Sequence, residues 1–180
     1  LLSFWCTNCA LIGKYFAQRY HLKHYCWILG QDAKKGNGLI KFIRPKATEL
    51  IAMSPFLATE FFINHHIMPE HVIPNGVNPL LFKNNKPARD IDVLGVGSLI
   101  PLKQYDLFID IIKAISYRYP SIKAVVAGKG PEENKLRKKT GQLKLENNIA
   151  LAGEKSHPEV LELMQRSKIF LHPSSYEGFC

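Results

Sequence analysis

Glycines, lysines and carboxylates gather at the ends of short β-type runs between Asp92 and Phe179. The tract alternates these runs with amphipathic stretches, and such alternation predicts an α/β fold in which helices join parallel strands. An open sheet of this kind binds its ligand at the carboxyl ends of its strands. The net charge of +9 and the pI of about 9.4 favour an anionic ligand. We therefore expect a site for a phosphate-bearing molecule at this edge of the sheet.

Helix signals separate the strands of this tract. Pro131, followed by Glu132 and Glu133, marks a helix start whose acidic residues complement the helix dipole. The run from Ser156 to Glu159 has the spacing of a capping box and marks another helix start. The predicted strands of the tract span residues 93–96, 122–127, 149–152 and 169–171, and the same alternation upstream predicts strands at 25–29, 50–53 and 71–73.

Five strings of the sequence, in order and at their separations, resemble one known family. They are VIPNGVNPLLF from Val72, VGSLIPLKQYDLFIDIIKAI from Val96, VVAGKGPEENKL from Val125, IALAG from Ile149 and LHPSSYEGF from Leu171. One string alone is weak evidence, because glycine after a strand is common, but five in the correct order are specific. The last four resemble the donor-binding domain of a retaining glycosyltransferase of the GT-B fold, in glycosyltransferase family four. The first resembles the entry into that domain.

The resemblance implies two Rossmann-like domains, with the donor bound in the cleft between them. Residues 1–77 are expected to form the back half of the acceptor-side domain, and residues 91–180 the front part of the nucleotide-sugar-binding domain. Residues 78–90 are rich in Asn, Lys and Pro and predict an interdomain linker. The chain begins at Leu1 without a methionine and stops at Cys180 inside the last string. We therefore expect a fragment of a longer polypeptide, unable to transfer sugar by itself.

Lys103 and Glu177 are the expected catalytic residues. Lys103 follows the first strand of the tract, where the family places a lysine on the donor diphosphate, although an ordinary loop lysine is the alternative interpretation. Relatives usually add an arginine five positions earlier, and this chain has Ser98, which donates a hydrogen bond but supplies no charge. Glu177 resembles the first of two glutamates that hold the sugar hydroxyls, and the second would lie past Cys180. We expect Lys103 and Glu177 to face one pocket.

Backbone groups at neighbouring strand ends are expected to complete the site. The resemblance implies that N–H groups at Gly178 and Phe179 bind the diphosphate. It also implies that the nucleobase lies near Gly153, Glu154 and Lys155, chiefly against their backbone. In the acceptor-side loop from Gly30 to Asp32, many relatives have a histidine at the position of Leu29. The expected donor-binding residues are Gly97, Ser98, Lys103, Gly128, Gly153, Glu154, Glu177, Gly178 and Phe179, and the expected acceptor-side residues are Gly30, Asp32 and Asn75.

The resemblance implies transfer of a sugar from a nucleotide diphosphate sugar to a hydroxyl of an unidentified acceptor, with retention of anomeric configuration. No cofactor and no metal are implied, and such enzymes build surface polysaccharide or glycolipid. Two alternatives stay open. A dinucleotide-dependent oxidoreductase is suggested by Gly95-Val96-Gly97, but Ile100 stands where the third glycine of that motif belongs. A non-catalytic nucleotide-sugar-binding module is suggested by Ser98 and Leu29.

Charge and cysteine usage limit the partners and the compartment. The basic composition suggests phosphate groups or an acidic membrane surface and disfavours nucleic acid, so peripheral attachment to the inner face of a membrane is one hypothesis. Cys6 and Cys9 form a Cys-x-x-Cys pair in a segment expected to be helical, which disfavours a redox site, and a zinc site needs two more ligands. The cysteines are therefore expected to be free thiols, and reduced cysteines are typical of a cytoplasmic protein.

Overall fold

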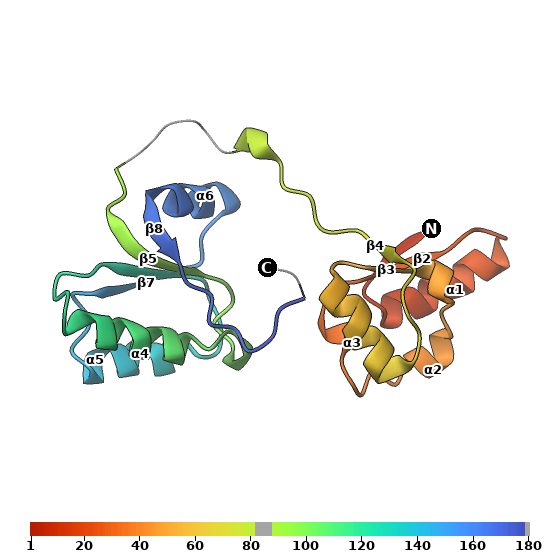
Figure 1. The fold of residues 1–180 in the computed structure, drawn as a ribbon, viewed down its shortest axis with the longest axis horizontal. Helices are drawn as coiled ribbons and strands as arrows, with labels where there is room; N and C mark the ends of the chain where they lie inside the picture. Colours follow the sequence, from red (N-terminus) through yellow and green to blue (C-terminus); the bar gives the residue numbers. More distant parts are fainter. Residues whose placement is uncertain (82–87, 179–180) are drawn as a thin grey trace. The chain divides into compact units, whose positions relative to one another are not determined.

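The computed structural model describes residues 1–81 and 88–178, which form two compact units (Figure 1). The first unit contains residues 1–77 together with the C-terminal end from Glu177 onward, and the second contains residues 78–176. Residues 82–87 of the segment predicted as a linker lie outside the described residues. Its described part begins with a short 3₁₀ turn, Pro79–Leu81.

The first unit is built on a parallel sheet of four short strands in the order β1-β2-β3-β4. Its core contains Ile28, Leu50, Leu57 and Phe61, which are fully buried. The α3 helix starts with Pro at its first position, and the hydroxyl of its N-cap Ser54 accepts a hydrogen bond from the N–H of Leu57. The elements are β1 (Leu2–Phe4), α1 (Asn8–Arg19), β2 (Tyr25–Ile28), η1 (Gln31–Ala33), α2 (Ile40–Ile43), η2 (Ala47–Glu49), β3 (Leu50–Ala52), α3 (Pro55–His65) and β4 (His71–Val72).

The start of the chain corrects one expectation, because the segment predicted as helical begins with a strand. β1 pairs in parallel with β2, and the ring of Phe4 stacks on Trp27 with a centroid separation of 5.7 Å. A strand of three residues is too short to show alternation, so its pairing decides its structure. The cysteine pair therefore follows a strand and lies at a helix start, so the helical context that disfavoured a redox site is wrong. Cys6 is fully buried, and Cys9 is exposed.

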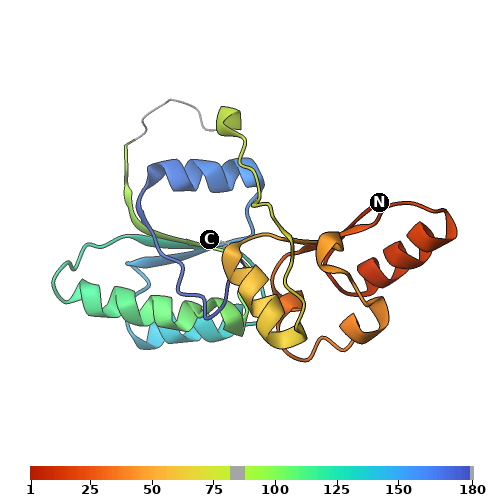
Figure 2. The same cartoon turned by 45° about the vertical axis from the view of Figure 1, so that its right-hand side comes forward.

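The second unit is a parallel sheet in the order β7-β6-β5-β8. The chain leaves β5 toward β6 and β7 and then returns to pair β8 with the other side of β5, which makes a topological switch point between β5 and β8. The helices α4 and α5 cover one face of the sheet and α6 covers the other (Figures 1 and 2). The elements are β5 (Ile91–Val96), η4 (Pro101–Lys103), α4 (Tyr105–Ser116), β6 (Ala124–Ala127), α5 (Glu133–Gln142), β7 (Ile149–Gly153), α6 (His157–Arg166) and β8 (Ser167–Phe170).

The α4 helix packs closely on this sheet. Phe108, Ile109 and Ile112 are fully buried, and a Cβ added at Gly95 would lie 2.9 Å from the ring of Tyr105. A side chain at position 95 would thus push the helix away from β5. The capping box predicted for α6 is present, since the Glu159 carboxylate accepts hydrogen bonds from both the N–H and the hydroxyl of Ser156.

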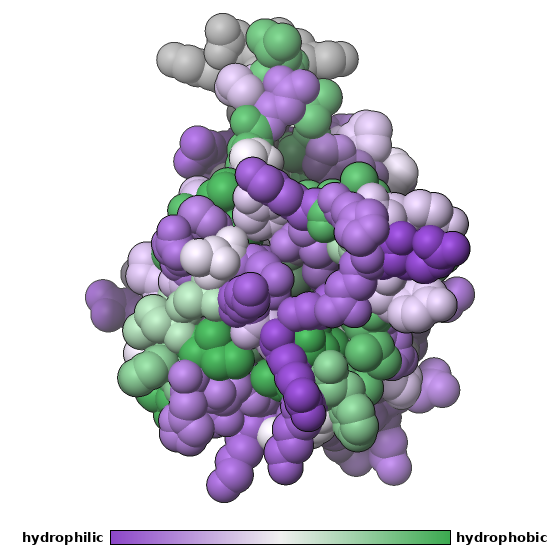
Figure 3. Space-filling model, turned by 90° about the vertical axis from the view of Figure 1, so that its right-hand side faces the viewer, coloured by the Kyte–Doolittle hydropathy of each residue, from purple (hydrophilic) through white to green (hydrophobic). Residues whose placement is uncertain are grey.

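Surface charge is largely balanced on the basic α5 helix. Lys135 and Arg137 pair with glutamates of the same helix region, and Lys139 pairs with Asp110 of α4 at 2.7 Å. Figure 3 shows one face of the molecule, on which hydrophilic side chains predominate and apolar ones gather in patches. Within residues 1–81 and 88–178, no helix is both long and apolar enough to cross a membrane.

Candidate functional site at the carboxyl edge of the second sheet

Three of the glycines predicted to bind the donor lie together at the carboxyl ends of β5, β6 and β7. The N–H of Gly97 donates to the carbonyl of Ala127 at 3.0 Å, and the N–H of Gly128 donates to the carbonyl of Gly153 at 2.8 Å. These hydrogen bonds continue past the sheet ladder and fix the three strand ends relative to one another. The sheet therefore presents closely spaced backbone at the edge where open α/β folds bind ligands.

A cavity of about 200 Å³ opens at this edge. Four of the predicted donor residues line it, namely Gly97, Ser98, Gly128 and Glu154. The cavity also has two lysines in its wall. Lys155 neighbours the residues expected near the nucleobase, whereas Lys129 was not among the predicted donor residues. The available signal was the position of Lys129, which follows β6 directly within a Gly-Lys-Gly run. Lys129 and Ser98 thus line the same cavity, and the lysine adds a positive charge to its wall.

Lys103 lies beside this cavity. It ends the η4 turn that follows β5, and its Cε lies 3.7 Å from the position that a Cβ of Gly97 would occupy. The loop after β8 is attached to the same turn, because the N–H of Ser175 donates to the carbonyl of Leu102 at 2.9 Å. The loops that follow β5 and β8 are thus joined at the switch point, and one of them carries the predicted catalytic lysine.

The other predicted catalytic residue, Glu177, belongs to the first unit, as does Gly178. The carbonyl of Gly178 accepts a hydrogen bond of 2.7 Å from the hydroxyl of Ser54, and a Cβ at position 178 would overlap the carbonyl oxygen of Leu29. Gly178 therefore packs directly on the loop that contains Gly30. The pocket predicted to be shared by Lys103 and Glu177 stays a prediction, and Phe179 lies outside the described residues.

The acceptor-side residues occupy the carboxyl end of the first sheet. Asp32 is buried, and its carboxylate accepts hydrogen bonds from the N–H groups of Cys6 and Gly30, both at 2.8 Å, and from that of Leu29 at 3.2 Å. The carboxylate thus holds the loop between β2 and η1 against the start of α1. Asn75 is exposed in the segment after β4.

Replacing Asp32 with alanine is expected to destabilise the first unit by about 3 kcal/mol, because three backbone N–H groups around the carboxylate lose their acceptor. Both tryptophans of the chain, Trp5 and Trp27, lie in this unit, so urea unfolding followed by tryptophan fluorescence measures the change. Glu70→Ala removes an exposed carboxylate of the same unit and should change stability by less than about 0.5 kcal/mol. Equal stability of the two variants would show that Asp32 does not organise the loop.

Comparison with known proteins decides the family. The family model for glycosyl transferases group 1 matches residues 77–180, which is more than half of the chain. The chain belongs to the group 1 glycosyl transferases. The match includes the entire second unit from residue 78 and therefore the cavity with Lys103 and Lys129 beside it.

Named relatives of this group 1 chain include a eukaryotic enzyme subunit and an archaeal protein. The phosphatidylinositol N-acetylglucosaminyltransferase gpi3 subunit of Schizosaccharomyces pombe is 28% identical over 148 residues, which cover 79% of this chain and 32% of that protein. The uncharacterized glycosyltransferase MJ1178 of Methanocaldococcus jannaschii is 29% identical over 178 residues, which cover 93% of this chain and 47% of that protein. The chain thus spans about a third to a half of the length of these relatives.

Solved structures show that the group 1 chain has the GT-B fold. The pneumococcal O-GlcNAc transferase GtfA, solved in complex with UDP and GlcNAc, matches 99% of this chain and 38% of its own with a TM-score of 0.74 and 15% identity. TarM of S. aureus matches 91% of this chain and 35% of its own with a TM-score of 0.71 and 18% identity. At these identities the likeness establishes the fold alone.

Proposed function

We propose that the protein to which this chain belongs transfers a sugar from a nucleotide diphosphate sugar to a hydroxyl acceptor with retention of anomeric configuration. The observation that carries the proposal is the cavity at the carboxyl edge of the second sheet, with glycine backbone in its wall and Lys103, Lys129 and Lys155 in or beside it. Ammonium groups and closely approachable backbone are the features that bind a diphosphate.

The reaction breaks the bond between the sugar and the diphosphate, and negative charge accumulates on the departing oxygen. Lys103 and Lys129 stabilise that charge, because they belong to the turns after β5 and β6 that lie in and beside the cavity. Glu177 accepts hydrogen bonds from the sugar hydroxyls and orients the ring. The departing phosphate oxygen takes the proton of the acceptor hydroxyl while the new glycosidic bond forms on the same face. This chemistry requires no redox cofactor and no metal.

The relatives suggest the first substrates to assay. The names of the fission-yeast subunit and of GtfA refer to N-acetylglucosamine, and GtfA was solved with UDP. UDP-N-acetylglucosamine is therefore the first donor, and phosphatidylinositol, from the name of the fission-yeast subunit, is the first acceptor. A membrane-embedded acceptor of this kind is consistent with a location at the cytoplasmic face of a membrane.

The decisive experiment measures transfer by the intact protein with a panel of UDP- and GDP-sugars, and determines the anomeric configuration of the product by NMR. A product with the donor's configuration is the expected result. Binding of the donor with neither hydrolysis nor transfer would instead favour a non-catalytic nucleotide-sugar-binding module. Protection from thermal unfolding by NAD, and not by UDP or GDP, would favour an oxidoreductase.

Lys129→Ala is expected to weaken UDP binding about tenfold, because it removes one of the ammonium groups of the cavity. Adding Ser98→Arg to the same variant should restore most of the affinity, since residue 98 lines the same cavity and the guanidinium returns the lost charge. Isothermal titration calorimetry measures both changes. Lys138→Ala, which removes an exposed lysine of α5, is the matched control and should bind UDP as the unmodified protein does. No recovery in the double variant would mean that residue 98 does not face the diphosphate.

A further inference from the structure

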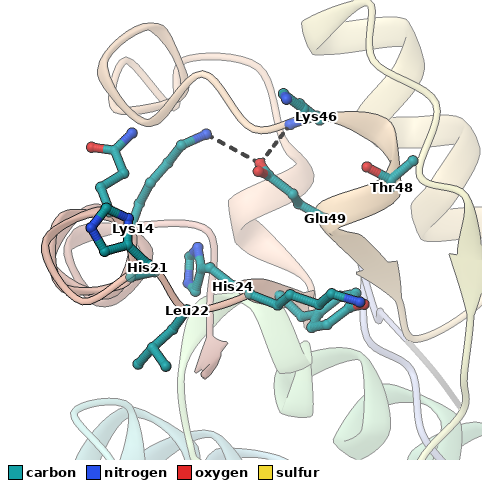
Figure 4. A pocket seen from close by; sticks show the side chains of 11 residues that line it. Lys14, His21, Leu22, His24, Lys46, Thr48 and Glu49 are labelled. Carbon is teal, nitrogen blue, oxygen red and sulfur yellow. Dashed lines mark hydrogen bonds and ion pairs between the residues drawn. The ribbon is translucent and has the colours of Figure 1, made fainter.

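A second cavity lies in the first unit, at the edge of the sheet opposite the acceptor-side loop. It has a volume of about 680 Å³, within the range of small-molecule sites. Its wall comes from α1 and the turn after it, from the residues that lead into β2, and from η2, which leads into β3 (Figure 4). The lining residues are Lys14, Ala17, Gln18, His21, Leu22, Lys23, His24, Tyr25, Lys46, Thr48 and Glu49.

Positive charge dominates this wall. Three lysines face one glutamate, and two imidazoles add polar groups that can donate hydrogen bonds. The Glu49 carboxylate is already engaged, since one of its oxygens accepts hydrogen bonds from the ammonium of Lys14 at 3.1 Å and from the N–H of Lys46 at 2.8 Å (Figure 4). Burial works against ionisation of Glu49, but these hydrogen bonds lower its pKa below the ordinary value. The carboxylate therefore neutralises only part of the charge, and an excess of positive charge remains.

The polar groups are held by different elements and reach the cavity from several directions. Lys14 belongs to α1. Its ammonium group is held by the ion pair with Glu49 and by a hydrogen bond of 2.7 Å that it donates to the carbonyl of Arg44. The ring of His24 is buried, and its Nε2 lies 2.9 Å from the hydroxyl of Ser3. Figure 4 shows Lys14 and Glu49 meeting over the cavity, with Lys46 on one side and His24 on the other. Donors arranged around a volume in this way suit an anion with oxygens on several sides.

The position of the cavity separates it from the proposed acceptor side. His24 and Glu49 directly precede β2 and β3, whereas Gly30 and Asp32 follow β2. Since all strands of this sheet are parallel, the two groups lie at opposite edges. The cavity is therefore a separate site, and its role does not depend on sugar transfer.

We propose that this cavity binds a phosphate monoester, with Lys14, Lys23 and Lys46 as the principal charged ligands and His21, His24 and Thr48 as further donors. A phosphate group offers three outward oxygens that accept charge-assisted hydrogen bonds from several directions, which a planar carboxylate does not. The remaining volume holds the organic part of the ligand. That part is either a soluble phosphorylated metabolite or the head group of a phosphorylated lipid, and both present the same chemistry.

The test uses the intact protein and the variant Lys23→Ala/Lys46→Ala. Both lysines are exposed, and the two substitutions leave the ion pair between Lys14 and Glu49 in place. The variant should therefore retain the fold. Lys35→Ala/Lys41→Ala removes the same charge from exposed positions of the same unit and is the matched control. Binding is measured by isothermal titration with inorganic phosphate and by sedimentation with phosphatidylcholine vesicles that contain or lack phosphatidic acid.

Saturable phosphate binding that weakens about tenfold in the cavity variant, and less than about twofold in the control, is the expected result. If the vesicles also bind only when they contain phosphatidic acid, and lose binding in the cavity variant alone, the source of the phosphate is a lipid head group. If phosphate binds and the vesicles do not, the source is a soluble ester. Absence of phosphate binding, or equal losses in the two variants, would overturn the proposal. Each of these outcomes is independent of whether UDP-sugars bind or react.

Discussion

Lys103→Ala is expected to lower kcat/KM for sugar transfer by about 100-fold to 1,000-fold in the intact protein. Lys103 is the last residue of η4, and its Cε lies near Gly97, which lines the cavity together with Gly128. It would stabilise the charge that develops on the diphosphate, so most of the loss should appear in kcat. Initial rates with UDP-N-acetylglucosamine over a range of donor concentrations separate the two constants.

Two controls make the result specific. Lys138→Ala removes an equal charge from an exposed site on α5 and should leave kcat within about twofold of the unmodified enzyme. Lys103→Arg keeps the charge but changes its geometry, and should recover part of the rate. If Lys103→Ala changes only KM, the lysine binds the donor equally in the ground state and the transition state, and its catalytic assignment is wrong.

The sequence predicted the second unit well because its signals are strong and local. Amphipathic stretches alternated with the short β-type runs, and glycines marked the ends of β5, β6 and β7, as the structure has them. Since all these strands run parallel, their carboxyl ends meet at one edge. The closeness of Gly97, Gly128 and Gly153 followed from that rule alone.

Contacts between distant segments were not predictable in this way. The three-residue strand β1 takes its structure from pairing with β2, about twenty residues later, and its own sequence carries no alternation to detect. The backbone hydrogen bond from the N–H of Ser175 to the carbonyl of Leu102 joins two loops that are far apart in the sequence. It forms only because of where both loops turn. Gly178 illustrates the same limit. A side chain at position 178 would overlap the carbonyl oxygen of Leu29, so the packing requires glycine. The sequence motif that contains Gly178 suggests only that its backbone N–H binds an anion.

Gly128→Ala is expected to destabilise the second unit by about 3 kcal/mol and to abolish measurable UDP binding. A Cβ at this position would overlap the carbonyl oxygen of Gly97, which is backbone and cannot rotate away. The N–H of Gly97 donates a hydrogen bond to the carbonyl of Ala127, which holds Gly97 in position. Relief of the overlap must therefore separate β5 from β6 at the cavity. Gly128 also has a φ of 154°, in the positive range that L side chains rarely adopt.

Hydrogen exchange read by mass spectrometry during urea unfolding locates the loss, since amides of β5 and β6 should lose protection before those of the first unit. Gly141→Ala provides the matched control, because this glycine lies within α5 and an added Cβ meets only the end of the Glu146 side chain, at 3.4 Å. Alanine has the higher helix propensity, so this variant should be as stable as the unmodified protein or more stable by up to about 1 kcal/mol. A Gly128→Ala protein that matches the control in stability would mean that the strand ends tolerate separation. Close packing of the ends of β5 and β6 would then not be needed to bind the diphosphate, and the geometric argument for the donor site would be wrong.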